Sequence, residues 1–409
     1  MNIPEEAVEL HKLHSGKLEV KSKVPLKNGR DLSLAYTPGV AEPCKLIKED
    51  KSKVYDYTLK SNSVAVISDG SRVLGLGNIG PEAGLPVMEG KAVLFKEFGG
   101  VDAFPICINV EDEEEFIKVA KALVPSFGGF NLEDISTPKC YDIEDRLKED
   151  LNIPVFHDDQ HGTAAVALAG VIGALKLVKK DIGKVKVVVN GAGAAGTAIA
   201  RLLLHMGTEN LSVCDVDGIL NPANTRLNRV QLELAKKTNP NCRIATLEDE
   251  VKGADVLIGV SAPGVFTVEL MKSMARDSIV FAMANPVPEA DRESALLAGV
   301  RVFGTGKSGE PNQVNNVLIF PGIFRGALDV RAKKINEEMK VAAVNALVSL
   351  ISDEELNENY VIPDPFDRRV APTVAKAVAS TAISTGVAGI CLSDEELNDI
   401  YEKRLFDIS

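Results

Sequence analysis

The stretch Val155–Lys180, VFHDDQHGTAAVALAGVIGALKLVKK, leads within a few residues into Val185–Ala200, VKVVVNGAGAAGTAIA. The first stretch joins an adjacent pair of aspartates to a long apolar segment, which predicts a helix buried on all sides. The second stretch has the pattern of a buried strand, a glycine turn and a helix. We therefore expect the aspartate pair to mark the junction between two halves of the chain.

Length and composition favour a two-domain soluble protein. A chain of 409 residues is too long for one compact core. The net charge of −12 argues against nucleic acid or an anionic membrane as the main partner. The most apolar run, residues 163–178, is too short to span a bilayer, and the first residues lack a signal-peptide core. The six cysteines are widely spaced without a C-x-x-C pair, which indicates reduced thiols and a cytoplasmic protein.

A glycine fingerprint follows the strand expected at 186–190. Its six residues are Gly191, Ala192, Gly193, Ala194, Ala195 and Gly196. A helix is expected at 197–206 and a second strand at 211–214, which is the βαβ context of a dinucleotide site. Asp215 lies 24 residues past Gly191, where a carboxylate would accept a hydrogen bond from a ribose 2′-OH and repel a 2′-phosphate. The pattern predicts NAD, with NADP as the alternative.

Polar residues follow the further strands expected in this half. Ser261 comes after the strand at 255–260, and Asn285 after the strand at 278–283. Asn315 and Asn316 lie beyond the strand at 300–303. Ligands of an open parallel sheet bind at the carboxyl ends of its strands, so these side chains are candidates for holding nicotinamide or substrate. Each asparagine alone would equally fit a turn.

The first half carries two acidic pairs, each at the end of an expected strand or short apolar segment. They are Glu133 with Asp134, and Asp158 with Asp159. One such pair alone would be read as a turn or a helix start, but two of them indicate a shared site. The glycines at 75, 77 and 80 match G-x-G-x-x-G in a poor context, so we expect a loop that passes close to another backbone.

Three further polar residues stand near turns or helix ends. Tyr36 precedes Thr-Pro-Gly, which by itself predicts a half-buried turn tyrosine. Arg72 lies before the glycine loop, where it could bind a carboxylate. Lys91 falls in a helix-like segment, 88–98, and we expect Gly84 and Pro86 to interrupt the chain between it and the loop. Most lysines in such segments are solvated.

These patterns together predict an α/β protein. We expect an N-terminal α/β domain at 1–157, a Rossmann-type doubly wound parallel sheet domain at 158–325, and C-terminal helices at 326–409. The near-repeats SDEELNENY (352–360) and SDEELNDIY (393–401) each open with a capping box and predict two helix starts.

The motifs AYTPGVAEP, NNVLIFPG and IPDPFDRRVAPTVAKAVA resemble the malic enzyme family in its compact bacterial and archaeal form. The resemblance covers nearly the whole chain. It implies oxidative decarboxylation of L-malate to pyruvate and CO2 with NAD(P) and Mg²⁺ or Mn²⁺, in a homodimer. One departure is HDDQHG, where larger relatives carry NDDIQG, so the resemblance assigns no role to His157 or His161.

The resemblance also implies individual roles. Tyr36 matches the general acid and Lys91 the general base, which also contacts substrate, while Asp158 supports the lysine. The metal ligands match Glu133, Asp134 and Asp159. Residues that hold substrate and nicotinamide match Arg72, Asn285, Asn315 and Asn316.

The chemistry of these residues agrees with the resemblance. Carboxylates without soft-ligand partners suit Mg²⁺ or Mn²⁺, and the rival is a zinc site that includes His157 and His161. A free lysine has a pKa of about 10.4, and we expect burial and a dication to lower that of Lys91. The alternative functions are a malolactic-type enzyme that releases lactate and a non-catalytic NAD-sensing module.

Overall fold

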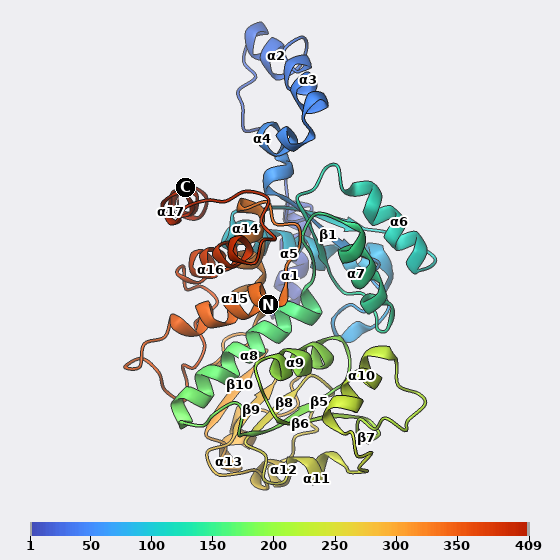
Figure 1. Cartoon of the computed structure of the whole chain (residues 1–409), viewed down its shortest axis with the longest axis vertical. Coiled ribbons are helices and arrows are strands. Elements are labelled where there is room, and N and C mark those ends of the chain that lie inside the picture. The colour runs from blue at the N-terminus through green and yellow to red at the C-terminus, as the bar shows by residue number, and fades with distance from the viewer. Residues whose placement is uncertain (1, 407–409) are drawn as a thin grey trace.

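The computed structural model describes residues 2–406 and shows an α/β protein with two sheets. The long helix α8 (Asp158–Val178) crosses between the sheets, and the C-terminal helices lie to one side of the first sheet and against α8 (Figure 1). A small group of helices near the N-terminus extends away from this body (Figure 1).

The first sheet has four parallel strands in the order β2-β1-β3-β4. Its strands are β1 (Ser63–Ser68), β2 (Asp102–Cys107), β3 (Gly129–Leu132) and β4 (Val155–His157). Val64 and Val66 pack in the same core cluster as residues of α5 (Gly80–Gly99). Ala65 and Ile67 point the opposite way, into a cluster with α6 (Glu113–Leu123) and α7 (Lys139–Asp150). The period of two in a strand thus places helices on both faces.

The second sheet has six strands in the order β10-β9-β8-β5-β6-β7. They are β5 (Lys186–Asn190), β6 (Asn210–Asp215), β7 (Gly218–Ile219), β8 (Val256–Gly259), β9 (Ile279–Ala282) and β10 (Val302–Thr305). All pairs are parallel except the short edge pair of β6 with β7. This is the Rossmann-type order, in which the chain reverses direction across the sheet beside β5.

Both faces of the second sheet are covered. Val187 and Val189 lie in the cluster that contains α8 and α9 (Ala194–His205), and Val188 lies in the cluster on the other face. That second cluster includes residues of α11 (Leu247–Val251), α12 (Val268–Lys272) and α13 (Arg292–Leu297). α10 (Arg229–Thr238) packs Leu234 and Ala235 into the first cluster.

Helix α8 is a core element. By length and composition it is apolar enough to cross a membrane, but it lies inside the protein. A Cβ on Gly173 would come 2.0 Å from the backbone oxygen of Val361, so the small residue lets that segment approach. The C-terminal helices pack here and against α5, namely α14 (Phe320–Asp329), α15 (Glu337–Ser349) and α16 (Val370–Ser384). The division of the chain at residues 157 and 325 stays a prediction.

Two expectations were wrong. The structure continues α5 back to Gly80, through Gly84 and Pro86, because the small Gly84 packs against Val73 and Gly70. Of the two near-repeats, only the second begins a helix, α17 (Asp394–Tyr401). At 352–360 the capping hydrogen bonds form, but the chain continues in turns. In α17, Leu397 and Tyr401 are buried and hold the helix against the body.

The N-terminal helices are mostly exposed, and Tyr55 and Asp56 contact Arg331 of the body. These helices are α1 (Ile3–His14), α2 (Gly29–Ala35), α3 (Ala41–Glu49) and α4 (Val54–Tyr57), and none contains a buried residue. We call residues 28–58, which contain α2 to α4, the N-terminal arm (Figure 1). Its exposed large apolar side chains are Leu32, Leu34, Tyr36, Val40 and Tyr57.

Candidate active site

Lys91 lies at the centre of a buried polar cluster. It is 7% exposed, and its Nζ lies 2.5 Å from Asp158 Oδ2 and 2.9 Å from Glu133 Oε1. The Nδ2 of Asn316 also donates to Asp158 Oδ2. These four residues come from α5, the end of β3, the start of α8 and the segment before α14. The fold therefore brings three other predicted residues together around Lys91.

Asp134 and Asp159 continue this cluster. The backbone N–H of Asp134 donates to Asp159 Oδ2 at 2.8 Å, and Asp134 has a left-handed backbone with φ of 54°. The Oδ2 atom of Asp134 is buried and has no hydrogen-bond partner within the chain. The two acidic pairs, distant in sequence, meet because β3 and β4 are neighbours and end at the same edge of the sheet.

Negative charge exceeds positive charge in this cluster. Burial, and then repulsion from neighbouring carboxylates, raises the pKa of Asp134 to about 8. Burial likewise raises the pKa of Asp158 and that of Asp159 to about 6. For Lys91, burial by itself lowers the pKa, but the carboxylates of Asp158 and Glu133 outweigh it and the pKa is raised. Burial thus acts on the Lys91 pKa in the expected direction, and the expected effect of a dication stays a prediction.

The carboxylates of this cluster are ligands of the kind that a divalent cation prefers. A hard cation would neutralise the excess charge of the buried carboxylates. It would also give the unpartnered Asp134 oxygen a partner. Across residues 2–406, however, no group of three or more His, Cys, Asp or Glu side chains is arranged to hold a metal ion. One reason is that Glu133 is turned toward Lys91.

The histidines beside the aspartate pair differ from each other. His161 Nε2 lies 2.9 Å from Glu144 Oε2, so its ring is engaged with a carboxylate of α7. His157 is fully buried, and neither of its ring nitrogens has a hydrogen-bond partner in the chain. The Nδ1 of His157 lies 3.8 Å from Asp159 Oδ2. The engagement of His161 weighs against the zinc alternative.

Gly162 makes room for Asp158. A Cβ at this position would lie 1.8 Å from Asp158 Oδ1. The glycine in HDDQHG therefore lets the aspartate fold back over the first turn of α8. The position was not singled out from the sequence, although a glycine one helical turn after a functional aspartate is a signal of this kind.

The glycine loop after β1 connects the two halves of the protein. The backbone N–H of Arg72 donates to the carbonyl of Asp134 at 3.0 Å, so Arg72 lies at the margin of the acid cluster. A Cβ on Gly75 would come 3.0 Å from Cδ of Pro286. The loop thus passes close to another backbone, as expected, and that backbone carries Asn285.

The fingerprint turn has the geometry of a dinucleotide site. Gly191 has φ of 111°, and a Cβ there would lie 2.5 Å from the carbonyl oxygen of Val260. A Cβ on Gly196 would lie 1.7 Å from the oxygen of Gly191. Helix α9 begins at Ala194, so its N-terminal N–H groups face the space where a pyrophosphate would bind. Asp215 ends β6, next to β5.

Comparison with known proteins identifies the family. The model "Malic enzyme, N-terminal domain" matches residues 15–148, and "Malic enzyme, NAD binding domain" matches residues 160–383. The bifunctional malic/malolactic enzyme of Bacillus subtilis is 60% identical over 404 residues, which is 98% of each protein. The chain belongs to the malic enzyme family.

Other members agree in sequence and in fold. The NAD-dependent malic enzyme of Geobacillus stearothermophilus is 57% identical over 91% of this chain and 78% of its own. The crystal structure of malic enzyme from Pyrococcus horikoshii superposes with a TM-score of 0.94 at 49% identity, covering 99% of this chain and 96% of that one.

Two predicted residues of this malic enzyme lie apart from the cluster. Tyr36 ends α2 in the N-terminal arm and is 67% exposed. Asn315 uses its Oδ1 to accept from the backbone N–H of Val317 at 3.0 Å and thereby caps the short turn that carries Asn316. One chain alone therefore does not bring Tyr36 to Lys91.

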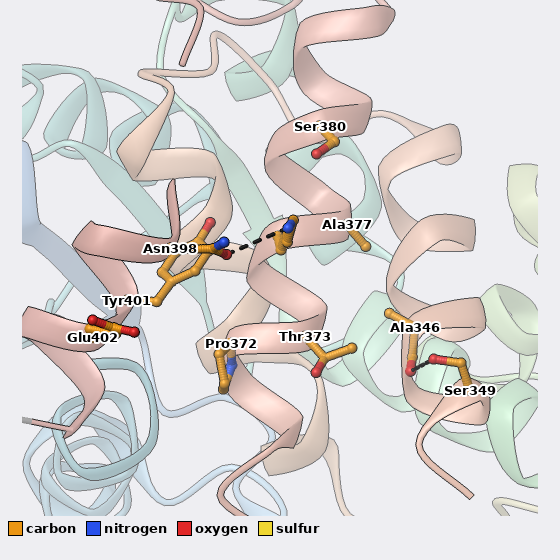
Figure 2. A pocket seen from close by; sticks show the side chains of 10 residues that line it. Ala346, Ser349, Pro372, Thr373, Ala377, Ser380, Asn398, Tyr401 and Glu402 are labelled. Atoms are coloured by element: carbon orange, nitrogen blue, oxygen red, sulfur yellow. Dashed lines mark hydrogen bonds between the residues drawn. The ribbon is translucent and has the colours of Figure 1, made fainter. Parts of the chain in front are cut away.

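A well-defined groove of the enzyme lies away from the Lys91 cluster. It has a volume of about 610 Å³ and lies between α15, α16 and α17 (Figure 2). Small residues such as Ala346, Thr373, Ala377 and Ser380 line it, and none of the predicted site residues does. This groove is therefore separate from the Lys91 cluster.

Proposed function

We propose that this chain oxidises and decarboxylates L-malate to pyruvate and CO2, with Lys91 as the general base. As a member of its family, it is an NAD(P)-dependent decarboxylating malate oxidoreductase. The observation that carries the role of Lys91 is its burial in contact with Asp158 and Glu133, at the edge where both acidic pairs converge.

The residues around Lys91 have complementary tasks. Oxidation at C2 requires loss of the hydroxyl proton, which Lys91 in its amine form accepts. Asp158 holds the lysine Nζ in place and is itself held by Asn316. Arg72 and Asn285, from opposite halves of the protein, are the groups we assign to the substrate carboxylates.

We assign Mg²⁺ or Mn²⁺ to Glu133, Asp134 and Asp159. The support is the surplus of carboxylates and the unpartnered Oδ2 of Asp134. A bound dication would act as a Lewis acid, which polarises a substrate oxygen and accepts the electron density released by decarboxylation. Glu133 also contacts Lys91 through Oε1, so a dication held by this carboxylate would compete with the lysine for it.

We infer a preference for NAD over NADP. The fingerprint glycines and the start of α9 suit the pyrophosphate, and Ser261, Asn285 and Asn315 belong to loops at the ends of the neighbouring strands. Asp215 would accept from a ribose 2′-OH and repel a 2′-phosphate. We also infer a cytoplasmic enzyme that binds small molecules, because the one membrane-length helix found among residues 2–406 is a core element.

We infer a homodimer in which Tyr36 serves the active site of the second copy. The arm that carries Tyr36 has no buried residue in its helices and exposes several large apolar side chains. Such a surface in one chain suits contact with another chain. In that site Tyr36 would protonate C3 of enolpyruvate, the general acid step that completes pyruvate.

The function is tested by an assay with L-malate. We expect NADH absorbance to appear with NAD and Mn²⁺, less with NADP, and none after the metal is chelated. Equal amounts of pyruvate and NADH should form. Lactate without net NADH would instead indicate the malolactic reaction, and NAD binding without turnover would indicate a sensing module.

A further inference from the structure

Glu289 is a buried carboxylate at the carboxyl ends of the Rossmann strands, and no motif drew attention to it. It is 0% exposed. Its Oε1 accepts from the backbone N–H of Ser261 at 2.7 Å and lies 3.2 Å from the Ser261 hydroxyl. Its Oε2 accepts from the backbone N–H of Ala284 at 2.9 Å. One side chain thus joins the loop after β8 to the loop after β9.

The connection extends to the fingerprint strand. Asn190, the last residue of β5, donates from Nδ2 to the Ser261 hydroxyl at 2.8 Å. The backbone of Glu289 accepts from Phe266 at 3.0 Å, which ties the far end of the β8 loop as well. The ends of three adjacent strands, β5, β8 and β9, are therefore joined through this carboxylate.

The donors around Glu289 require a carboxylate. Backbone N–H groups approach both of its oxygens, and only an ionised carboxyl accepts at both positions. A glutamine would accept at one of them and present its own NH2 to the other donor. Within the described chain no Lys, Arg or His forms an ion pair with Glu289, so its hydrogen bonds are what offset the burial of its charge.

A glycine at the end of β8 also leaves space for the Glu289 side chain. Gly259 ends β8, and a Cβ there would lie 2.5 Å from Cδ of Glu289. Asp215 lies on β6, on one side of β5, whereas the loops joined by Glu289 lie on the other side. A dinucleotide whose adenosine ribose binds Asp215 extends its nicotinamide half toward these loops.

We propose that Glu289 is a positioning residue that sets the loops of Ser261 and Asn285 and so places the nicotinamide half of the dinucleotide. This inference rests on the proposed cofactor site. It assigns Glu289 no contact with the substrate or the dinucleotide, because the carboxylate acts through the two backbone N–H groups that it holds.

The test compares two probes, NADH and ADP-ribose, which lacks nicotinamide. Loss of a hydrogen bond to a charged group predicts that Glu289→Gln raises the Kd of NADH about tenfold, while the Kd of ADP-ribose changes less than about twofold. Glu289→Asp keeps the charge but is one methylene too short to reach both donors, so it should give the same contrast.

Glu250→Gln is the matched control. Glu250 is also a buried carboxylate of this domain, and it accepts from Ser212 and Arg243 away from the cofactor loops. Its variant should leave both affinities unchanged. Unchanged NADH binding in either Glu289 variant, or equal weakening of both probes, would overturn the proposal. Because binding needs no turnover, this result is independent of whether the wild type oxidises malate.

Discussion

The Lys91 cluster and the N-terminal arm carry the two predicted proton-transfer residues in opposite environments. Lys91 is 7% exposed and contacts two carboxylates, whereas Tyr36 is 67% exposed. The cluster is complete within one chain because three strand or helix ends meet at one edge. The arm contacts the body through Tyr55 and Asp56, which lie against Arg331, but Tyr36 itself stays exposed. The fold therefore positions Lys91 within one chain, whereas we propose that Tyr36 acts in an assembly of two chains.

The largest effect is expected at Lys91. Replacement by alanine removes the base, so malate oxidation should fall by about 10³-fold or more. NADH binding should stay near the wild-type value, because the fingerprint turn lies in the other domain. Steady-state kinetics and a fluorescence titration measure the two quantities. Comparable turnover in this variant would remove Lys91 from the mechanism.

Substitutions in the core and in the arm should also differ in how much they destabilise the protein. Phe324 is fully buried between the rings of Phe95 and Phe156, and its replacement by alanine should cost about 3–5 kcal/mol of unfolding free energy. Leu34→Ala in the arm is the matched change, and it should cost less than about 0.5 kcal/mol at concentrations where the chain is a monomer. Denaturant unfolding measures both, and equal losses would mean that the arm is part of the monomer core.

Tyr36→Phe keeps the ring and removes the acid. We expect turnover to pyruvate to fall by about 10²-fold with little change in unfolding, since the side chain is exposed. The specific readout is the tautomerisation of added enolpyruvate. If the variant catalyses that step as fast as the wild type, Tyr36 is not the acid.

Two glycine substitutions test the same contrast between the Lys91 cluster and the arm, with smaller expected effects. Gly162→Ala places a methyl group against Asp158 and should destabilise the protein by about 1–3 kcal/mol while lowering turnover. Gly29→Ala in the arm meets no atom within 4 Å and should be neutral or slightly stabilising. Thermal unfolding and turnover distinguish them, and an active, stable Gly162→Ala would show that Asp158 needs no such space.

The sequence predicted local elements and chemistry better than assembly. The run of valines at 187–189 and the GAGAAG turn are local patterns, so the Rossmann strands and the fingerprint helix were confirmed. The capping box at 352–360 misled because the chain turns directly after it, where Asn357 pairs with Tyr360. Glu289 was missed because its role depends on backbone donors from two distant loops. The raised Lys91 pKa depends on distances that no sequence spacing contains.

The most direct test of a shared active site is a hybrid dimer of one Lys91→Ala chain and one Tyr36→Phe chain, isolated with two different affinity tags. If Tyr36 serves the partner's cluster, one site of the hybrid has both wild-type residues, and activity should return to about half that of the wild type. Activity no higher than that of the two variants alone, or failure of the chains to co-purify, would show that Tyr36 does not serve the partner's cluster.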